Sequence, residues 1–317
     1  MQVGILCPGM FVIALVGCAV MLTRAVAQIS APPPMVIYNS NEQDSGDLYL
    51  LDIRHQLRLN LTRSPGIDSA ASPAPDGQAI AFQSTRDGNR EIYVLDLQTF
   101  ATRNLTHHPA ADMFPAWSPD GEVIAFVSDR DGDAEIYAVN IVSGATVNLS
   151  RSPGPDARPS WSPDGRQMVF ASHRALDTDL YIMDMPPRPD PVWPDRPQVR
   201  ALSPSPASDL DPAWSPDGRH IVFRSNRGDN IGRLYLLDVD SGDLHYLPTG
   251  DRGVDQTPSW SSDGTQLVFW SFRDSSNDIY LMDLRGRLAG EETEPPVINL
   301  TNSPARETLP VWFPGWR

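Results

Sequence analysis

The chain has 317 residues, of which 40% are hydrophobic and 21% charged, and 31 are proline. These values exclude a disordered chain and are typical of a globular protein with a large core and many turns. The 25 basic residues, all of them arginine, face 40 aspartates and glutamates, which gives a formal net charge of −15. An acidic chain without lysine lacks the basic surface that nucleic acid needs, so nucleic acid is excluded as a partner, and so is lysine chemistry.

The first 27 residues have the pattern of an export signal. An apolar stretch runs from Val3 to Leu22, and a small-x-small cleavage pattern ends at Ala27. Three outcomes remain open: cleavage after Ala27, retention of residues 3–22 as a membrane tether, and lipidation of Cys18, whose LVGC context resembles a bacterial lipobox. All three place the rest of the chain outside the cytoplasm, whether periplasmic, secreted or membrane-anchored.

After a proline-rich linker at residues 28–34, the chain is built from an internal repeat. The string PAWSPDG from Pro115 recurs as PSWSPDG, PAWSPDG and PSWSSDG, with a degraded copy, ASPAPDG, from Ala71. The glycines of these copies are 44, 44, 53 and 46 residues apart; they are Gly77, Gly121, Gly165, Gly218 and Gly264. One structural unit of about 44 residues is therefore used repeatedly.

Each unit predicts four short strands in a fixed order. A Trp-containing run comes first, an alternating run such as 123–128 ends in aromatic-x-Ser, a third run such as 135–139 follows a polar turn, and a short run ends in Asn-Leu-Thr or a similar triplet. This alternation, with β-branched and aromatic residues between Asp-Gly or Ser-Gly turns, is typical of strands joined by hairpins. Four strands of about 5 residues fill the unit, so each unit is expected to form one antiparallel sheet.

Recurrent aromatic positions indicate six units. The second strands carry Tyr38, Phe82, Phe126, Phe170, Phe223 and Phe269. The first unit starts at Met35 without a Trp strand, whereas a spare copy containing Trp312 follows the sixth unit. We therefore predict an all-β, six-bladed β-propeller over residues 35–317, closed by its C-terminal strand, which removes the free edges of an open stack. An open solenoid is the alternative, and it would need capping repeats.

The run x-P-x-W-S-P-D-G, followed by aromatic-x-S-x-R and by acid-I-Y, resembles the propeller repeats of TolB, the periplasmic component of the Tol-Pal system. The resemblance covers nearly all of residues 35–317 and implies a TolB-like repeat family. A propeller hosts unrelated activities, so the resemblance implies the fold more than the function. Because the propeller begins soon after Ala27, the protein is expected to lack the N-terminal α/β domain by which TolB engages other Tol components.

Catalytic motifs are sparse. Prolyl-oligopeptidase-like enzymes share such repeats, but the sequence has no G-x-S-x-G nucleophile elbow. Some lyases on similar propellers hold a metal through histidines, and His107, His108 and His173 are predicted at one end of the ring; scattered surface histidines are the alternative. The favoured function is a monomeric, non-catalytic, exported scaffold that binds a protein or peptide at the cell envelope, and the alternative is a polysaccharide-active, metal-dependent lyase.

One acidic position recurs in all six units, five residues before the tryptophan or its equivalent. It is occupied by Asp68, Asp112, Asp156, Asp209, Asp255 and Glu307. These residues are expected where one blade passes to the next, at one mouth of the central channel. Six like charges there would raise one another's pKa unless a cation or basic group lies among them, and they would attract cations. The sequence thus predicts a ligand site for a metal ion such as Ca²⁺ or for a basic peptide, with an Asx-type turn as the alternative.

Other regularities have structural explanations. The recurrent tryptophans are expected to pack between blades; they are Trp117, Trp161, Trp214, Trp260 and Trp312. Arginines after the second strands are expected to pair across the next hairpin, for example Arg130 with Glu135. Insertions at 185–200 and 285–296 follow third strands, and they are either docking loops on one face or tolerated loop growth.

Overall fold

The computed structural model describes residues 34–315, apart from 43–45, 186–196, 203, 229, 251–252, 274 and 292–293. The expected export signal at 1–27, residues 28–33 of the expected linker and most of the insertion at 185–200 lie outside the described residues. In the part of the protein that is described, no helix is long and apolar enough to span a membrane.

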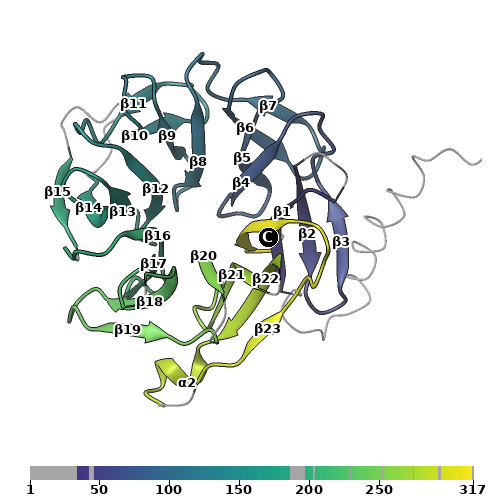
Figure 1. The fold of residues 1–317 in the computed structure, drawn as a ribbon. Helices are drawn as coiled ribbons and strands as arrows, with labels where there is room; N and C mark the ends of the chain where they lie inside the picture. Colours follow the sequence, from purple (N-terminus) through teal and green to yellow (C-terminus); the bar gives the residue numbers. More distant parts are fainter. Residues whose placement is uncertain are drawn as a thin grey trace, which may run out of the picture. The chain divides into compact units, whose positions relative to one another are not determined.

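The described residues form six four-stranded antiparallel sheets, arranged as blades around a central axis (Figure 1). From the innermost strand outward, blade 1 consists of β24 (Glu307–Phe313), β1 (Met35–Ser40), β2 (Asp47–Asp52) and β3 (Leu57–Asn60). Blade 2 consists of β4 (Asp68–Pro73), β5 (Ala79–Ser84), β6 (Glu91–Asp96) and β7 (Thr102–Asn104). Blade 3 consists of β8 (Asp112–Trp117), β9 (Val123–Ser128), β10 (Glu135–Asn140) and β11 (Thr146–Asn148).

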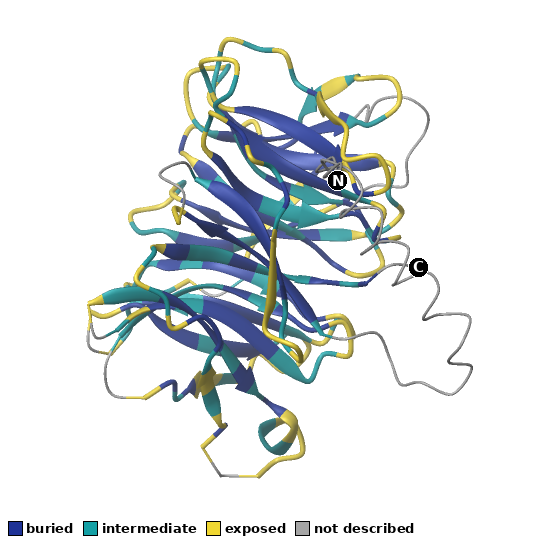
Figure 2. Ribbon diagram, turned by 90° about the vertical axis from the view of Figure 1, so that its right-hand side faces the viewer, coloured by how far each residue is buried: buried dark blue, intermediate teal, exposed yellow. Residues whose placement is uncertain are grey.

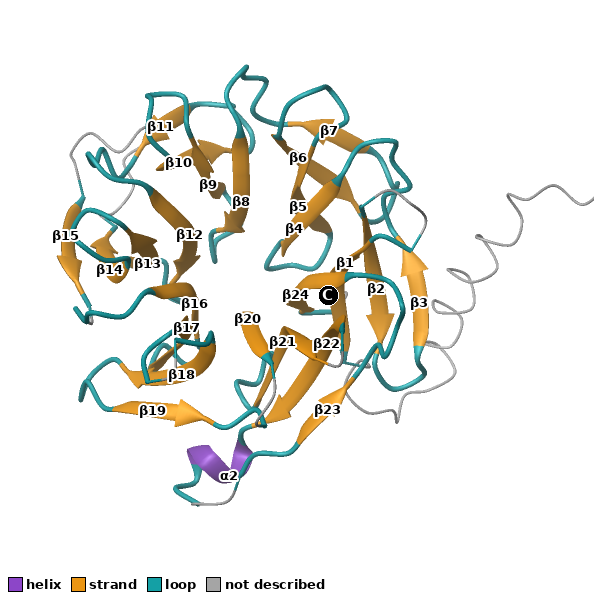
Figure 3. Ribbon diagram, viewed as in Figure 1, coloured by secondary structure: helices purple, strands orange, loops and turns teal. Residues whose placement is uncertain are grey.

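The second half of the ring repeats this order. Blade 4 consists of β12 (Asp156–Trp161), β13 (Gln167–Ser172), β14 (Asp179–Asp184) and β15 (Gln198–Ala201). Blade 5 consists of β16 (Asp209–Trp214), β17 (His220–Ser225), β18 (Arg233–Asp238) and β19 (Leu244–Leu247). Blade 6 consists of β20 (Val254–Trp260), β21 (Gln266–Arg273), β22 (Ser276–Asp283) and β23 (Val297–Asn299). A short helix, α2 (Arg285–Leu288), lies in the β22–β23 connection at the outer rim (Figure 3).

The ring is closed by pairing between the first and last strands of the propeller. β24 runs antiparallel to β1, with Thr308 opposite Asn39 and Trp312 opposite Val36. The six-bladed propeller and its closure by the C-terminal strand are therefore confirmed.

The second and third strands of each blade hold most of the buried side chains (Figure 2). In blade 3, Phe126 lies directly opposite Tyr137, and their ring centroids are 5.9 Å apart. The same pair occurs in every blade, with centroid distances from 5.8 to 6.2 Å. Aromatic residues at matching strand positions thus build one core layer per blade.

The tryptophans pack between blades, as their regular spacing predicted. Trp161 of blade 4 belongs to a cluster that contains both Ala125 of blade 3 and Phe170 of blade 4. Its Nε1 donates to the carbonyl oxygen of Ala116 at 3.1 Å. Where the preceding blade has serine instead of alanine, the serine hydroxyl accepts the backbone N–H of the tryptophan, as Ser160 does from Trp214 at 3.1 Å. The alternation of PAW and PSW in the sequence therefore selects between two kinds of interblade hydrogen bond.

Candidate functional site at the central channel

Five of the recurrent carboxylates are the first residue of an inner strand and Asp255 is the second residue of β20, yet none is exposed to solvent. All six have a relative exposure of 0%. Each forms an ion pair with an arginine of its own blade. The pairs are Asp68–Arg86, Asp112–Arg130, Asp156–Arg174 and Asp255–Arg273 at 2.9 Å, Asp209–Arg227 at 2.5 Å, and Glu307–Arg58 at 3.2 Å.

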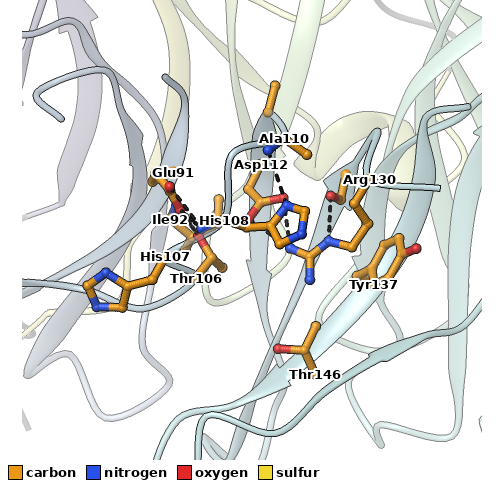
Figure 4. A network of polar contacts seen from close by, with 12 residues as sticks. Glu91, Ile92, Thr106, His107, His108, Ala110, Asp112, Arg130, Tyr137 and Thr146 are labelled. Atoms are coloured by element: carbon orange, nitrogen blue, oxygen red, sulfur yellow. Dashed lines mark hydrogen bonds and ion pairs between the residues drawn. The ribbon is translucent and has the colours of Figure 1, made fainter. Parts of the chain in front are cut away.

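Blade 3 shows how the pairs of blades 2 to 6 are held (Figure 4), whereas in blade 1 Arg58 reaches Glu307 from the outer strand β3. Nη2 of Arg130 donates to the two carboxylate oxygens of Asp112 at 3.0 and 2.9 Å, and its Nε donates to Oγ of Ser128 at 2.9 Å. The guanidinium carbon lies 5.4 Å from the centroid of the Phe126 ring and 4.7 Å from that of Tyr137. The aromatic pair of the core thus supports the arginine, and the arginine neutralises the buried carboxylate.

This pairing corrects the expected partner of the arginine. Arg130 was expected to pair with Glu135 across the following hairpin, but β8 and β9 place Asp112 opposite Ser128, so Arg130 lies next to Asp112. The corresponding glutamate of blade 2, Glu91, instead accepts hydrogen bonds from Oγ1 of Thr106 at 2.6 Å and from the backbone N–H of His108 at 3.0 Å (Figure 4).

The six carboxylates are not equally satisfied. Asp112 and Asp156 receive hydrogen bonds on both oxygens, and Asp255 receives them from Arg273 and Thr249. In contrast, one buried oxygen has no hydrogen-bond partner among the described residues in three cases: Oδ1 of Asp68, Oδ1 of Asp209 and Oε2 of Glu307. Burial raises the pKa of these same three carboxyl groups above the usual values.

This geometry differs from the expected open ring of like charges. A basic group, arginine, does lie beside each carboxylate, and no carboxylate has exposed surface with which to contact a ligand. Nor do the residues fit a metal ion: among those described, no group of three or more His, Cys, Asp or Glu could hold one. The described residues include the six carboxylates and also His107, His108 and His173. Binding of a basic peptide by these carboxylates stays a sequence-based prediction.

The channel itself is a separate cavity of about 370 Å³, bounded by the inner strands of all six blades. The six carboxylates are not among its lining residues. Its walls carry prolines and tryptophans at matching positions of successive strands: Pro115, Pro159, Pro212, Pro258 and Pro310, and Trp117, Trp161, Trp214 and Trp260. Most lining residues are therefore apolar, although polar and apolar atoms contribute about equally to the surface of the wall.

One lining position per strand differs from blade to blade. It lies two residues after each carboxylate, where a β-bulge interrupts the pairing of the inner strand. The six residues there have positive φ values between 45° and 57°; they are Ala70, Phe114, Arg158, Asp211, Thr257 and Leu309. All six line the cavity. A backbone conformation that disfavours side chains is thus kept in every blade, although the residue type varies.

The charged members of this set meet in one corner of the channel. Nε of Arg158 lies 3.1 Å from Oδ1 of Asp211, and Nε of Arg224, from β17, lies 3.4 Å from Oδ2 of the same aspartate. The guanidinium of Arg158 also lies over the ring of Phe114, 3.9 Å from its centroid. Burial lowers the pKa of Arg158, and the neighbouring Asp211 opposes this shift.

Sequence reasoning missed this corner, although the signal was present. Aligning the repeats shows a different residue two positions after each carboxylate, and a different residue before each second-strand serine, where Arg224 stands. The regular positions define the fold, and the repeated prolines and tryptophans among them also line the channel, whereas the irregular positions give the lining a different side chain in each blade.

A larger cavity, of about 550 Å³, lies between blades 2 and 3. Its carboxylates are Asp76, Asp96 and Asp120, and each accepts backbone N–H bonds within its own turn, from Gln78, Gln98 and Glu122 respectively. These acidic groups act as turn formers, so the central channel is the stronger candidate site.

Comparison with known proteins agrees with this architecture. No curated protein sequence matches this one. Among solved structures, TolB from Acinetobacter baumannii has a TM-score of 0.75 at 20% identity, covering 93% of this chain and 70% of that one. A nidogen/laminin complex has a TM-score of 0.65 at 11% identity, covering 88% and 98%. An oligogalacturonate lyase in complex with manganese has a TM-score of 0.53 at 15% identity, covering 80% and 87%.

At these identities, the structural likenesses establish the fold alone. The family is established by sequence, because the model of the TolB beta propeller domain matches residues 26–152 and 143–252, more than half of the protein. The protein therefore belongs to the TolB β-propeller domain family.

Proposed function

We propose that this protein is an exported, non-catalytic propeller that binds an extended segment of a partner protein in its central channel, at the cell envelope. The observation that carries the proposal is the channel wall, in which repeated prolines and tryptophans surround six positions that differ between blades. Concave, mostly apolar sites with a few polar groups are typical of ligand binding. One structure with the same fold, a nidogen/laminin complex, supports a binding role by its name.

The lining offers little for catalysis. Among the described residues that bound the cavity, the ionisable side chains are Arg158 and Asp211, and Asp211 already faces two guanidinium groups. A nucleophile needs a base within hydrogen-bond reach, and no histidine lies among these lining residues. The alternative, a metal-dependent lyase, needs three or four ligands around one ion, and the described residues provide no such group.

Binding in the channel can be tested by filling it. Leu309 lines the cavity, so Leu309→Trp should block entry of a partner segment. Leu57→Trp is the matched control, because Leu57 is 63% exposed on the outer strand β3. Immobilised wild type and Leu57→Trp should retain one stoichiometric partner from an envelope extract, whereas Leu309→Trp should not. Equal retention by all three proteins would contradict channel binding, and bound metal with polyuronide turnover would favour the lyase.

Export has its own test. The apolar stretch from Val3 to Leu22, the pattern ending at Ala27 and the TolB relationship support an extracytoplasmic location. Intact-mass analysis of protein from the producing cells should show a polypeptide that starts at Gln28. A polypeptide that starts at Met1, or one lipidated at Cys18, would support the other two outcomes.

A further inference from the structure

We infer that the channel selects a partner segment that carries an aspartate or glutamate side chain, and that Arg158 receives its carboxylate. The inference rests on the proposed function, because it specifies which segment the channel accepts. The acidic net charge of the protein suggested a basic partner, but Arg158 and Asp211 of the channel lining, together with the adjoining Arg224, carry one net positive charge.

The first observation is an imbalance of charge. Asp211 is 8% exposed and lies between two guanidinium groups, 3.1 Å from Arg158 and 3.4 Å from Arg224. Two cations, Arg158 in the channel wall and Arg224 behind it, therefore share one anion. Partly desolvated charge is unfavourable unless it is neutralised, so this corner is complementary to one further anion.

The second observation is that Arg158 is held in position before any ligand arrives. Its guanidinium is stacked on Phe114, and the backbone N–H of Phe114 donates to Oε1 of Gln83 at 3.1 Å. The contact with Asp211 uses Nε, which leaves the two Nη atoms for a second carboxylate. A planar guanidinium fixed in this way loses little conformational entropy on binding.

The third observation is an unused hydrogen-bonding group in the same wall. Oγ1 of Thr257 is buried and has no hydrogen-bond partner among the described residues, and Thr257 lines the cavity with Arg158. Rotation of the Thr257 side chain about χ1 would be needed to expose this hydroxyl, which would then donate to an incoming carboxylate. The rest of the wall is mostly proline, tryptophan, alanine and other apolar residues, which suits the neighbouring parts of a peptide better than a hydrated saccharide. We therefore favour an acidic peptide over an acidic saccharide.

The test selects peptides from a random library of C-terminally amidated heptapeptides on immobilised full-length protein, so that only acidic side chains supply a carboxylate. The variant is Arg158→Gln, and the matched control is Arg285→Gln, which removes the same charge from α2, where the Arg285 side chain is 70% exposed. Wild type and control should enrich peptides with an acidic residue, and Arg158→Gln should not. The best acidic peptide should bind the variant about tenfold more weakly or worse, which corresponds to about 1.4 kcal/mol. Its amide analogue should bind wild type just as weakly.

The possible outcomes distinguish failure of the carboxylate inference from failure of the proposed function, peptide binding in the channel. Enrichment without acidic preference would overturn the carboxylate inference and leave peptide binding intact. Absence of any enriched peptide would overturn both. Displacement of the best acidic peptide by oligogalacturonate, with turnover, would replace the peptide by an acidic saccharide and thus also overturn the inference. Arg158→Lys keeps the charge without the planar fork, so it should retain the acidic preference at reduced affinity even if Arg158→Gln is unstable in thermal unfolding.

Discussion

Each buried carboxylate joins two parts of its blade that are distant in the sequence. In blade 3, Asp112 opens the inner strand, and Arg130 follows the second strand, 18 residues later. The pair is stabilised by hydrogen bonds to both carboxylate oxygens and by the two aromatic rings beneath the guanidinium. Removing one partner would leave the other charged and desolvated.

We predict that Asp112→Asn destabilises the protein instead of altering cation binding. Breaking a buried pair on one side should lower the free energy of unfolding by about 2–4 kcal/mol, because Asp112 is fully buried and the Arg130 side chain is 14% exposed. Asp133→Asn, at an exposed position in the same blade, should change it by less than about 0.5 kcal/mol. Urea unfolding followed by tryptophan fluorescence measures both. Equal stability of the two variants would show that the pair has no structural role.

A second residue-scale prediction concerns pH. Burial raises the pKa of Asp209 in the folded state, so its proton stabilises the fold fully below the unfolded pKa, and this stabilisation is lost as pH rises through the folded pKa. Wild type should therefore lose stability relative to Asp209→Asn as pH rises from about 4, the usual aspartate value. The pKa of Asp96 is shifted in the opposite direction, because hydrogen bonds from Thr99 lower it. The contribution of Asp96 to the stability of the fold is therefore lost as pH falls. Urea unfolding over a pH series gives the difference in free energy of unfolding between wild type and Asp209→Asn, and between wild type and Asp96→Asn. The two differences should change with pH in opposite directions. Parallel changes would refute the assignment.

At the scale of strands, the repeated features of the fold could be predicted from the sequence. The contacts that depend on the register between strands could not. Alternation and turn residues were sufficient to predict four strands per blade and the place of Trp161 between blades. The partner predicted for Arg130 was wrong. Glu135 is closer in the sequence, but the pairing of Asp112 with Ser128 places Asp112 next to Arg130. Arg158 and Arg224 could not be connected from sequence, because their contact runs through Asp211 of a third strand.

The two kinds of interblade hydrogen bond give a matched pair of tryptophans. Trp260 and Trp214 are 7% and 8% exposed, but Nε1 of Trp260 donates to Ala213 at 3.1 Å, whereas Nε1 of Trp214 is buried without a hydrogen-bond partner in the described structure. Both Phe substitutions remove similar packing. Trp260→Phe should therefore cost about 1 kcal/mol more than Trp214→Phe in urea unfolding, since it also leaves a carbonyl unpaired. Equal costs would mean that the indole hydrogen bond contributes nothing.

At the scale of the whole molecule, stability depends on the last strand. β24 is the innermost strand of blade 1, and its Phe313 is 3% exposed in a cluster with residues of blades 1 and 2. Without it, the edge of β1 and the neighbouring face of blade 2 would be open to solvent.

We therefore predict that deleting residues 307–317 lowers the melting temperature by about 10 °C or more. Deleting only residues 315–317, which follow β24, should leave it nearly unchanged. Differential scanning calorimetry compares the three proteins. A melting temperature for the longer deletion within a degree or two of the full-length value would disprove stabilisation by closure.

The bulge in each inner strand gives the channel one lining position per blade whose residue type the framework does not fix. Carboxylate, arginine, aromatic pair and tryptophan recur around the ring, while Ala70, Phe114, Arg158, Asp211, Thr257 and Leu309 share only a backbone conformation. Substitutions at these six positions can therefore accumulate during evolution without disturbing the framework. Two members of this family with nearly identical repeats could then recognise unrelated partners, and orthology is better judged by six channel residues than by the overall percentage of identity.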